Sequence, residues 1–181
     1  MKRAVLVVAL LVAMGAAAFM AYANNRKPTR NTITPAPSAT MSTSPRVAEC
    51  QTSVLAATLT SSGGAAGTIY YSLALKNTGA KTCTERGYPG VSLVDGSGSM
   101  LGQPATRNSS VTPQTITLSP GASVYAQVGV PNAGNFGPGQ CSANSAALRV
   151  YPPDQTQYLQ VNAQLQSCPG FSTTALSSTQ H

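Results

Sequence analysis

The sequence is short of charge and lacks residues on which several enzyme classes depend. Only 8% of its 181 residues are Asp, Glu, Lys or Arg, against roughly 25% in average soluble domains. It has no tryptophan, and its single histidine is the last residue, His181. A Ser–His–Asp hydrolase needs an internal histidine as general base, and copper or zinc sites need clustered His, Cys or Met ligands. We therefore predict no catalytic triad, no metal site and no cofactor.

Acidic residues are also scarce, which limits the remaining enzyme classes. The carboxylate pair of a glycosidase would have to come from Glu49, Glu85, Asp95 and Asp154. Both aspartates lie in turn sequences, where Asp commonly accepts hydrogen bonds from nearby backbone. The run Gly96–Ser99 fits a loop tip rather than a nucleophile motif, and the Gly-rich segments lack the ending of a phosphate loop. We expect no catalytic residues and predict that the protein is not an enzyme.

The formal net charge of +7 suggests a nucleic-acid or membrane partner until its location is considered. Six of the eleven basic residues precede Cys50, and the chain from Cys50 onward has five basic and three acidic residues. Nucleic-acid affinity depends on a clustered basic face that neutralises phosphates. Five scattered cations do not make such a face, so we expect no nucleic-acid partner.

The first 48 residues resemble an export segment followed by a linker. A basic start, Met1–Arg3, precedes 20 apolar or small residues at 4–23, which end in the small-x-small pattern of a signal-peptidase site. Twenty such residues also suffice to span a bilayer, so a cleaved signal peptide and an uncleaved anchor both remain open. Residues 24–48 are rich in Thr, Ser, Pro and Ala and predict a disordered linker. We expect membrane contact only through residues 4–23, if they are retained.

From residue 49 onward, apolar and polar residues alternate with the period of two that is typical of half-buried strands. The segments with this character are 68–76, 122–130, 148–151 and 158–163, with shorter apolar segments at 54–59, 91–94 and 115–118. Turn-forming residues separate them, for example at Ser61–Gly64 and Pro152–Asp154. We predict an all-β domain at 49–171, an antiparallel immunoglobulin-like β-sandwich of seven to eight strands, and a disordered tail at 172–181.

An even number of cysteines in a chain that begins with an export segment predicts two disulfides and an oxidising compartment. The four are Cys50, Cys83, Cys141 and Cys168. Residues that face each other across a hairpin have numbers with a constant sum. The last two cysteines are symmetric about the turn at Asp154, and the first two about the turn that ends at Gly67. This symmetry favours the pairs Cys50–Cys83 and Cys141–Cys168, each closing the open end of one hairpin.

Two segments of the sequence are distinctive, Cys83–Gly90 (CTERGYPG) and Leu148–Pro153 (LRVYPP). Together with their surroundings, from Glu49 to Cys168, they resemble the actinobacterial exported domain-of-unknown-function family numbered 4232. The resemblance implies an extracytoplasmic β-sandwich and an actinobacterial source, and it implies no activity. Many members of that family resemble lipoproteins, whereas this chain has no cysteine near residues 4–23 to carry a lipid.

Two groups of residues are candidates for binding a partner. Arg86 and Tyr88 lie in the distinctive loop, and loops on a rigid scaffold often carry binding residues. Outward-facing tyrosines would form a glycan- or protein-binding patch, since tyrosine is enriched at interfaces. These tyrosines are Tyr70, Tyr125, Tyr151 and Tyr158. The structural alternatives are a tight bend for the loop and, for Tyr151 and Tyr158, a cross-strand pair facing solvent.

The sequence alone therefore predicts a non-enzymatic exported module, secreted or tethered to the outer face of the cytoplasmic membrane. Its partner would be an unknown envelope protein or glycan. The alternative is a carrier of a small lipid or glycan ligand, which requires an apolar cavity of roughly a few hundred Å³ between the sheets.

Overall fold

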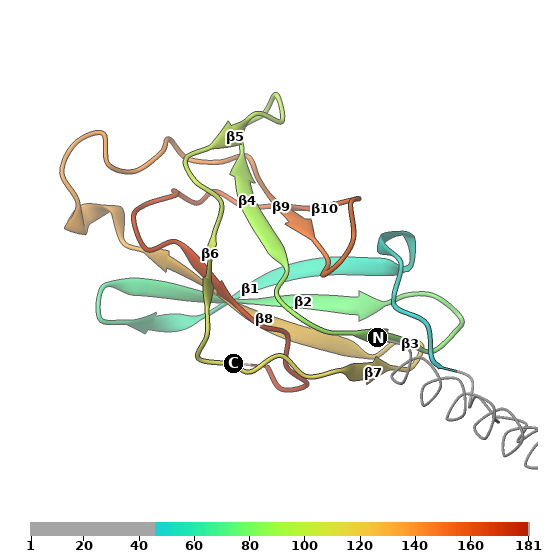
Figure 1. Ribbon diagram of the computed structural model, residues 1–181. Helices are drawn as coiled ribbons and strands as arrows, with labels where there is room; N and C mark the ends of the chain where they lie inside the picture. The colour runs from blue at the N-terminus through green and yellow to red at the C-terminus, as the bar shows by residue number, and fades with distance from the viewer. Residues whose placement is uncertain (1–45, 181) are drawn as a thin grey trace, which may run out of the picture. The chain divides into compact units, whose positions relative to one another are not determined.

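The computed structural model describes residues 46–180, which are built from strands and two short 3₁₀-helices (Figure 1). The predicted leader and most of the predicted linker, like residue 181, lie outside the described residues. The elements are, in chain order, η1 (Thr52–Val54), β1 (Leu55–Ala65), β2 (Thr68–Asn77), β3 (Cys83–Glu85), β4 (Gly90–Val94), β5 (Met100–Leu101), β6 (Thr106–Asn108), β7 (Ile116–Leu118), β8 (Ser123–Pro131), η2 (Ala133–Asn135), β9 (Ala147–Tyr151), β10 (Leu159–Asn162) and β11 (Ser172–Thr174). The all-β class is confirmed over this range. No helix in the described part is long and apolar enough to cross a membrane.

The strands form three sheets. A five-stranded sheet has the order β1-β2-β8-β11-β6, a four-stranded sheet has the order β10-β9-β4-β5, and β3 pairs with β7. All seven segments predicted as strands are strands. Residues 46–180 hold eleven strands rather than seven to eight, because β3, β5, β6 and β11 have only two or three residues, too few for alternation to reveal. The pairing of β11 with β6 is parallel, so the fold is not purely antiparallel.

Alternation along the strands builds one hydrophobic core from both larger sheets. Leu73 of β2, Val124 of β8, Leu93 of β4 and Leu148 of β9 are fully buried and belong to the same cluster of side chains. Figure 1 shows β4, β9 and β10 grouped on one side of β1, β2 and β8. Burial of each such side chain stabilises the fold by about 1.5–3 kcal/mol. The facing apolar rows therefore hold the two sheets together.

The β1–β2 hairpin reverses later than the sequence predicts. Strand β1 continues through the predicted turn at Ser61–Gly64, with a register shift after Ser61. The reversal lies at Ala66 and Gly67, whose φ angles are 48° and 79°. Positive φ at both central residues is typical of the two-residue turn that matches the twist of paired strands. The small residues of the Gly-rich run therefore lengthen the hairpin instead of ending it.

The disulfide Cys141–Cys168 is present and forms for the predicted reason. In the β9–β10 hairpin Val150 pairs with Leu159, the same register that the two cysteines have. This register continues beyond the strands, because the backbone N–H of Ser142 donates a 2.9 Å hydrogen bond to the carbonyl of Ser167. The disulfide therefore closes the open end of the hairpin.

The disulfide Cys50–Cys83 is also present, but its geometry differs from the prediction. Glu49 and Thr84 form a parallel bridge, so the segment before η1 runs alongside β3. The bond therefore joins two neighbouring segments outside the β1–β2 hairpin rather than closing that hairpin. The symmetry of the cysteine positions predicts the correct pairing, but it does not predict the contact between neighbouring segments that brings the two cysteines together.

The C-terminal segment 172–180 is part of the fold, which corrects the predicted disordered tail. Ser172–Thr174 form β11, and Leu176 is 1% exposed. The hydroxyl oxygen of Thr174 accepts a 2.9 Å hydrogen bond from the backbone N–H of Gln127. A Ser/Thr-rich sequence is typical of a linker, but here the polar groups have partners and can be buried.

Candidate functional site

Strand β3 positions the most unusual side chain of the domain, Glu85. In the β3–β7 pair Glu85 lies opposite Ile116. Side chains alternate along a strand, so Glu85 shares a face with Cys83, whose disulfide to Cys50 fixes this strand. Glu85 is only 3% exposed. The strand therefore carries a carboxyl group into the interior.

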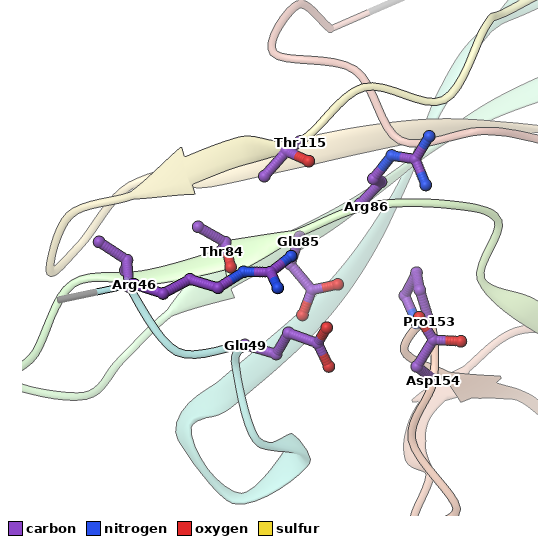
Figure 2. Close-up of a pocket in the computed structure, with 9 residues that line it drawn as sticks. Arg46, Glu49, Thr84, Glu85, Arg86, Thr115, Pro153 and Asp154 are labelled. Carbon is purple, nitrogen blue, oxygen red and sulfur yellow. The ribbon is translucent and has the colours of Figure 1, made fainter. Parts of the chain in front are cut away.

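A polar hollow of about 180 Å³ lies against Glu85 (Figure 2). It is formed where the segment before η1, strand β3 with its following loop, and the β9–β10 turn meet. Glu49 and Asp154 bring two more carboxylates to it, and Arg46 and Arg86 bring two guanidinium groups. The lining residues are Arg46, Val47, Glu49, Thr84, Glu85, Arg86, Thr115, Pro153 and Asp154.

The carboxyl of Glu85 is held in its protonated form at neutral pH. Burial is the largest cause, and the carboxylates of Glu49 and Asp154 act in the same direction, so that the pKa of Glu85 is raised from 4.5 to about 8. Its Oε1 atom is buried and has no hydrogen-bond partner. An unmade hydrogen bond of a buried group costs about 1–3 kcal/mol, and such atoms are rare in folded proteins. Folding therefore leaves one oxygen of the Glu85 carboxyl unpaired beside the hollow.

The hollow suits a small polar molecule better than a metal ion. Within residues 46–180 no three His, Cys, Asp or Glu side chains are grouped closely enough to hold one metal ion. The carboxylates of Glu49 and Asp154 offer hydrogen-bond acceptors, and protonated Glu85 offers a donor as well. Arg46 and Arg86 add donors with a fixed positive charge. The arrangement can bind a ligand through charge and hydrogen bonds.

The predicted recognition loop borders this hollow through Arg86 but not through Tyr88. Tyr88 is half-buried; its hydroxyl donates a 3.4 Å hydrogen bond to the carbonyl of Val111, and the Arg107 guanidinium lies 5.5 Å from its ring centroid. Gly87 has a φ of 121° and lies against Pro153 of the β9–β10 turn. The loop therefore brings Arg86 to the site, while Tyr88 holds the loop in place.

Tyr151 and Tyr158 face each other across β9–β10, as the sequence predicts, with ring centroids 5.7 Å apart in an edge-to-face arrangement. The guanidinium of Arg149 lies 4.5 Å from the centroid of the Tyr158 ring. It also donates a 2.9 Å hydrogen bond to the carbonyl of Gly98. These contacts make an ordered aromatic surface on this sheet, and a role in partner binding stays a prediction.

Tyr70 and Tyr125 do not join that pair in a single patch. They lie on β2 and β8, in the five-stranded sheet rather than the four-stranded one. Tyr70 is opposite Gly129, four residues along β8 from Tyr125, a separation of roughly 13 Å at the usual rise of a strand. The structure therefore divides the four predicted tyrosines between two sheets.

Sequence reasoning considered Glu49, Glu85 and Asp154 only as possible members of a glycosidase pair and missed all three as binding residues. One signal could have found Glu85, which follows the disulfide cysteine Cys83 by two residues. In an extended strand this spacing puts both side chains on the same face. The convergence of Asp154 from a distant turn has no counterpart in the local sequence.

The comparisons with known proteins agree with this structural unit. No curated protein and no solved structure matches the chain. Residues 50–180 match the model of a family described as a domain of unknown function (DUF4232). The matched region contains both disulfides, Glu85 and the C-terminal segment that completes the fold. Because it spans more than half of the sequence, the chain belongs to this family of domains of unknown function.

Proposed function

We propose that this protein is a non-enzymatic, exported binding module of the cell envelope, and that its ligand occupies the hollow against Glu85. One observation carries the proposal: a carboxyl that is 3% exposed has an oxygen without a hydrogen-bond partner and lines a hollow with four other charged side chains. A ligand that bonds this oxygen supplies an interaction that folding leaves unmade. We therefore expect a ligand to gain most binding free energy in this hollow.

The parts of the hollow are held in place, which favours binding. The bridge between Glu49 and Thr84 and the disulfide Cys50–Cys83 fix the segment before η1 against β3. Asp154 has a φ of 57°, a conformation set by the tight β9–β10 turn. A site that is ordered before the ligand arrives loses little conformational entropy on binding.

The exported part of the proposal rests on other observations. Residues 1–23 have the composition of a signal peptide or a single-span anchor. Two disulfides indicate an oxidising environment outside the cytoplasm. We further propose an immunoglobulin-like sandwich for the two large sheets that share a core, an actinobacterial source, and an envelope protein or glycan as the partner.

The test uses the full chain and soluble glycan and peptide fractions from the envelope of the cells that make it. We expect at least one fraction to shift the backbone NMR signals of Thr84–Arg86, Glu49 and Asp154. Replacement of Asp154 by Asn removes a lining charge and tolerates the positive φ, so it should weaken binding. Asp95→Asn removes an exposed carboxylate from a different turn and should leave binding unchanged. Binding that shifts other residues, or no binding of any fraction, would overturn the proposal.

A second candidate function, a carrier of a small lipid, is favoured by a different hollow. This one has a volume of about 500 Å³ and lies beside Cys141–Cys168, between Gly102–Pro104 and Pro169–Phe171. The volume is within the usual range of small-molecule sites. It opens at the surface, however, and not between the sheets, where buried side chains form the core. Native mass spectrometry of the full chain from its own cells would show a bound lipid if the carrier function holds, and an unliganded chain if it does not.

A further inference from the structure

Three carboxyl groups from three distant parts of the sequence meet at the hollow. Glu49 precedes η1, Glu85 ends β3, and Asp154 lies in the β9–β10 turn. Figure 2 shows the three groups directed toward a common space. Glu49 and Asp154 are near enough to raise the pKa of Glu85 beyond the effect of burial. Two carboxylates therefore oppose ionisation of Glu85 in addition to burial.

The arginines of the hollow do not neutralise this group of carboxyls. The groups that set the pKa of Glu85 are burial, Glu49 and Asp154, and all three raise it. Figure 2 shows the guanidinium of Arg86 turned away from the three carboxyls. Arg46 lines the hollow from the N-terminal segment, and β7, which pairs with β3, contributes no titratable side chain. Figure 2 shows the Arg46 guanidinium on the side of Glu85 and Glu49, but among residues 46–180 neither arginine forms an ion pair with the three carboxyls, which still lack a cationic partner.

A primary ammonium group fits this arrangement. It carries one positive charge and three N–H donors, and the hollow offers carboxylate acceptors on more than one side. Within the described residues no three such side chains are grouped closely enough to hold a metal ion, whereas an ammonium group needs only one or two acceptors at hydrogen-bond distance. The unpartnered Oε1 of Glu85, on a side chain that is 3% exposed, gives such a cation a specific bond to make.

We propose that the hollow binds a small organic cation through its primary ammonium group, and that binding displaces the proton of Glu85. The inference rests on the proposed function, since it names the class of ligand for the same site. The step balances in atoms and charge: the Glu85 carboxyl loses one proton to solvent, and its carboxylate then accepts N–H hydrogen bonds from the ammonium. Glu49 and Asp154 line the same hollow and add negative charge that attracts the cation.

Proton displacement makes the affinity depend on pH in a defined direction. The pKa of Glu85 is about 8 in the free protein, and an adjacent ammonium lowers it. Between about pH 6 and pH 8 each complex formed therefore releases up to one proton, and affinity rises up to about tenfold per pH unit. Above the pKa the carboxyl is already ionised and the dependence ends.

The experiment titrates n-butylammonium into the full chain in amine-free buffer and follows the backbone NMR signals of Glu85 and its neighbours. Two probes serve as controls: n-butanol has the same chain without the charge, and tetramethylammonium has the charge without an N–H donor. We expect n-butylammonium to bind with a dissociation constant that falls about tenfold from pH 6 to pH 7. The neutral alcohol should cause no shift, and tetramethylammonium should bind at least about tenfold more weakly.

Two variants keep the proposal falsifiable. Glu85→Gln is neutral at all pH values, so it should bind n-butylammonium more weakly and without the pH dependence. If that variant fails to fold, Asp154→Asn tests the same site by removing one acceptor charge, with Asp95→Asn as its control. Equal binding of n-butanol, or an affinity that does not change with pH, would overturn the inference. If envelope fractions bind this hollow and n-butylammonium does not, the ammonium inference alone is wrong. If neither binds, the proposed function is wrong as well.

Discussion

Glu85 places a titratable group inside a domain that has few charges. Its carboxyl lies where burial and two neighbouring carboxylates oppose ionisation. The fold accepts this because the group stays protonated, which removes the much larger cost of a buried charge. A residue held in this way couples the stability of the fold to pH.

The first prediction concerns that coupling. In the unfolded chain Glu85 ionises near its usual pKa of 4.5, whereas in the folded chain its pKa is about 8. Between these values the folded state holds a proton that the unfolded state has released. The free energy of unfolding should therefore fall as pH rises, by up to about 1.4 kcal/mol per pH unit. Glu85→Gln should lose this contribution, and urea unfolding at several pH values would measure the difference in slope; equal slopes would contradict the assignment.

Asn77 is the second residue whose burial depends on its side-chain bonds. It is 0% exposed, and its amide donates to the carbonyls of Lys81 and Leu118 at 2.8 and 3.1 Å. Its Oδ1 accepts from the backbone N–H of Gly79 at 2.9 Å. Asn77→Ala leaves these buried groups without a partner and should destabilise the domain by about 2–4 kcal/mol, as measured by urea unfolding. A loss below about 0.5 kcal/mol would show that water replaces the amide.

At the scale of single residues, the sequence predicts contacts within a turn and misses contacts between residues that are distant in the sequence. Asp95 lies in a turn, as expected, and its Oδ1 accepts hydrogen bonds from the backbone N–H groups of Ser97 and Ser99, both 2.9 Å long. Those partners lie within four residues, so turn chemistry is enough to predict them. The environment of Glu85 depends on Asp154, nearly seventy residues away. No local pattern carries that information.

The β1–β2 hairpin shows how local geometry acts at the scale of an element. Its two-residue turn puts Ala66 at a φ of 48°, where residues with a Cβ are strained and asparagine or glycine is preferred. The hairpin pairs over the whole length of β2 and also supports β8. The turn residue therefore affects the register of the largest sheet.

The third prediction follows from that turn. Ala66→Asn creates an Asn-Gly turn with Gly67 and should stabilise the domain by about 0.5–1 kcal/mol. Ala65→Asn is the matched control, because Ala65 pairs with Thr68 as the last residue of β1 and gains nothing from a preference for positive φ. Thermal unfolding of both variants measures the effect. Equal melting temperatures for the two variants would contradict the turn assignment.

The elements divide by length in how far the sequence predicts them. Alternation over nine or ten residues predicts β2 and β8, because each such strand has one face in the core. Strands of two or three residues, such as β5 and β11, depend on neighbours that lie far away in the sequence. The buried polar residues of β11 also break the expectation that a Ser/Thr-rich segment is exposed.

At the scale of the whole molecule, the two disulfides tie the candidate site and the β9–β10 hairpin to the fold. Cys50–Cys83 spans 33 residues and fixes the segment that carries Glu49 against β3. Cys141–Cys168 spans 27 residues and closes the hairpin whose turn carries Asp154. The first disulfide therefore fixes one side of the hollow, whereas the second closes the end of the hairpin opposite to Asp154.

The fourth prediction concerns the different effects of the two disulfides on stability and on ligand binding. Removal of either disulfide by paired Cys→Ser substitution should lower the free energy of unfolding by about 3–4 kcal/mol, as loops of this size restrict the unfolded chain. Loss of Cys50–Cys83 should also free Glu49 and weaken ligand binding at the hollow. Loss of Cys141–Cys168 should lower stability with a smaller effect on binding, because the β9–β10 pairing remains. Urea unfolding and the NMR titration measure the two effects, and an identical loss of binding in both variants would contradict this division.

The measurement that tests the central claim most directly is the titration of the Glu85 side-chain carboxyl by carbon-detected NMR in the full chain. A protonated glutamate that lines a ligand site should titrate with a midpoint near pH 8, where its pKa lies. The midpoint should fall in the presence of n-butylammonium, since a bound cation favours the carboxylate. A midpoint near 4.5, the usual value for glutamate, would show that Glu85 is solvated and ionised. That result would contradict the buried carboxyl on which the proposed site depends.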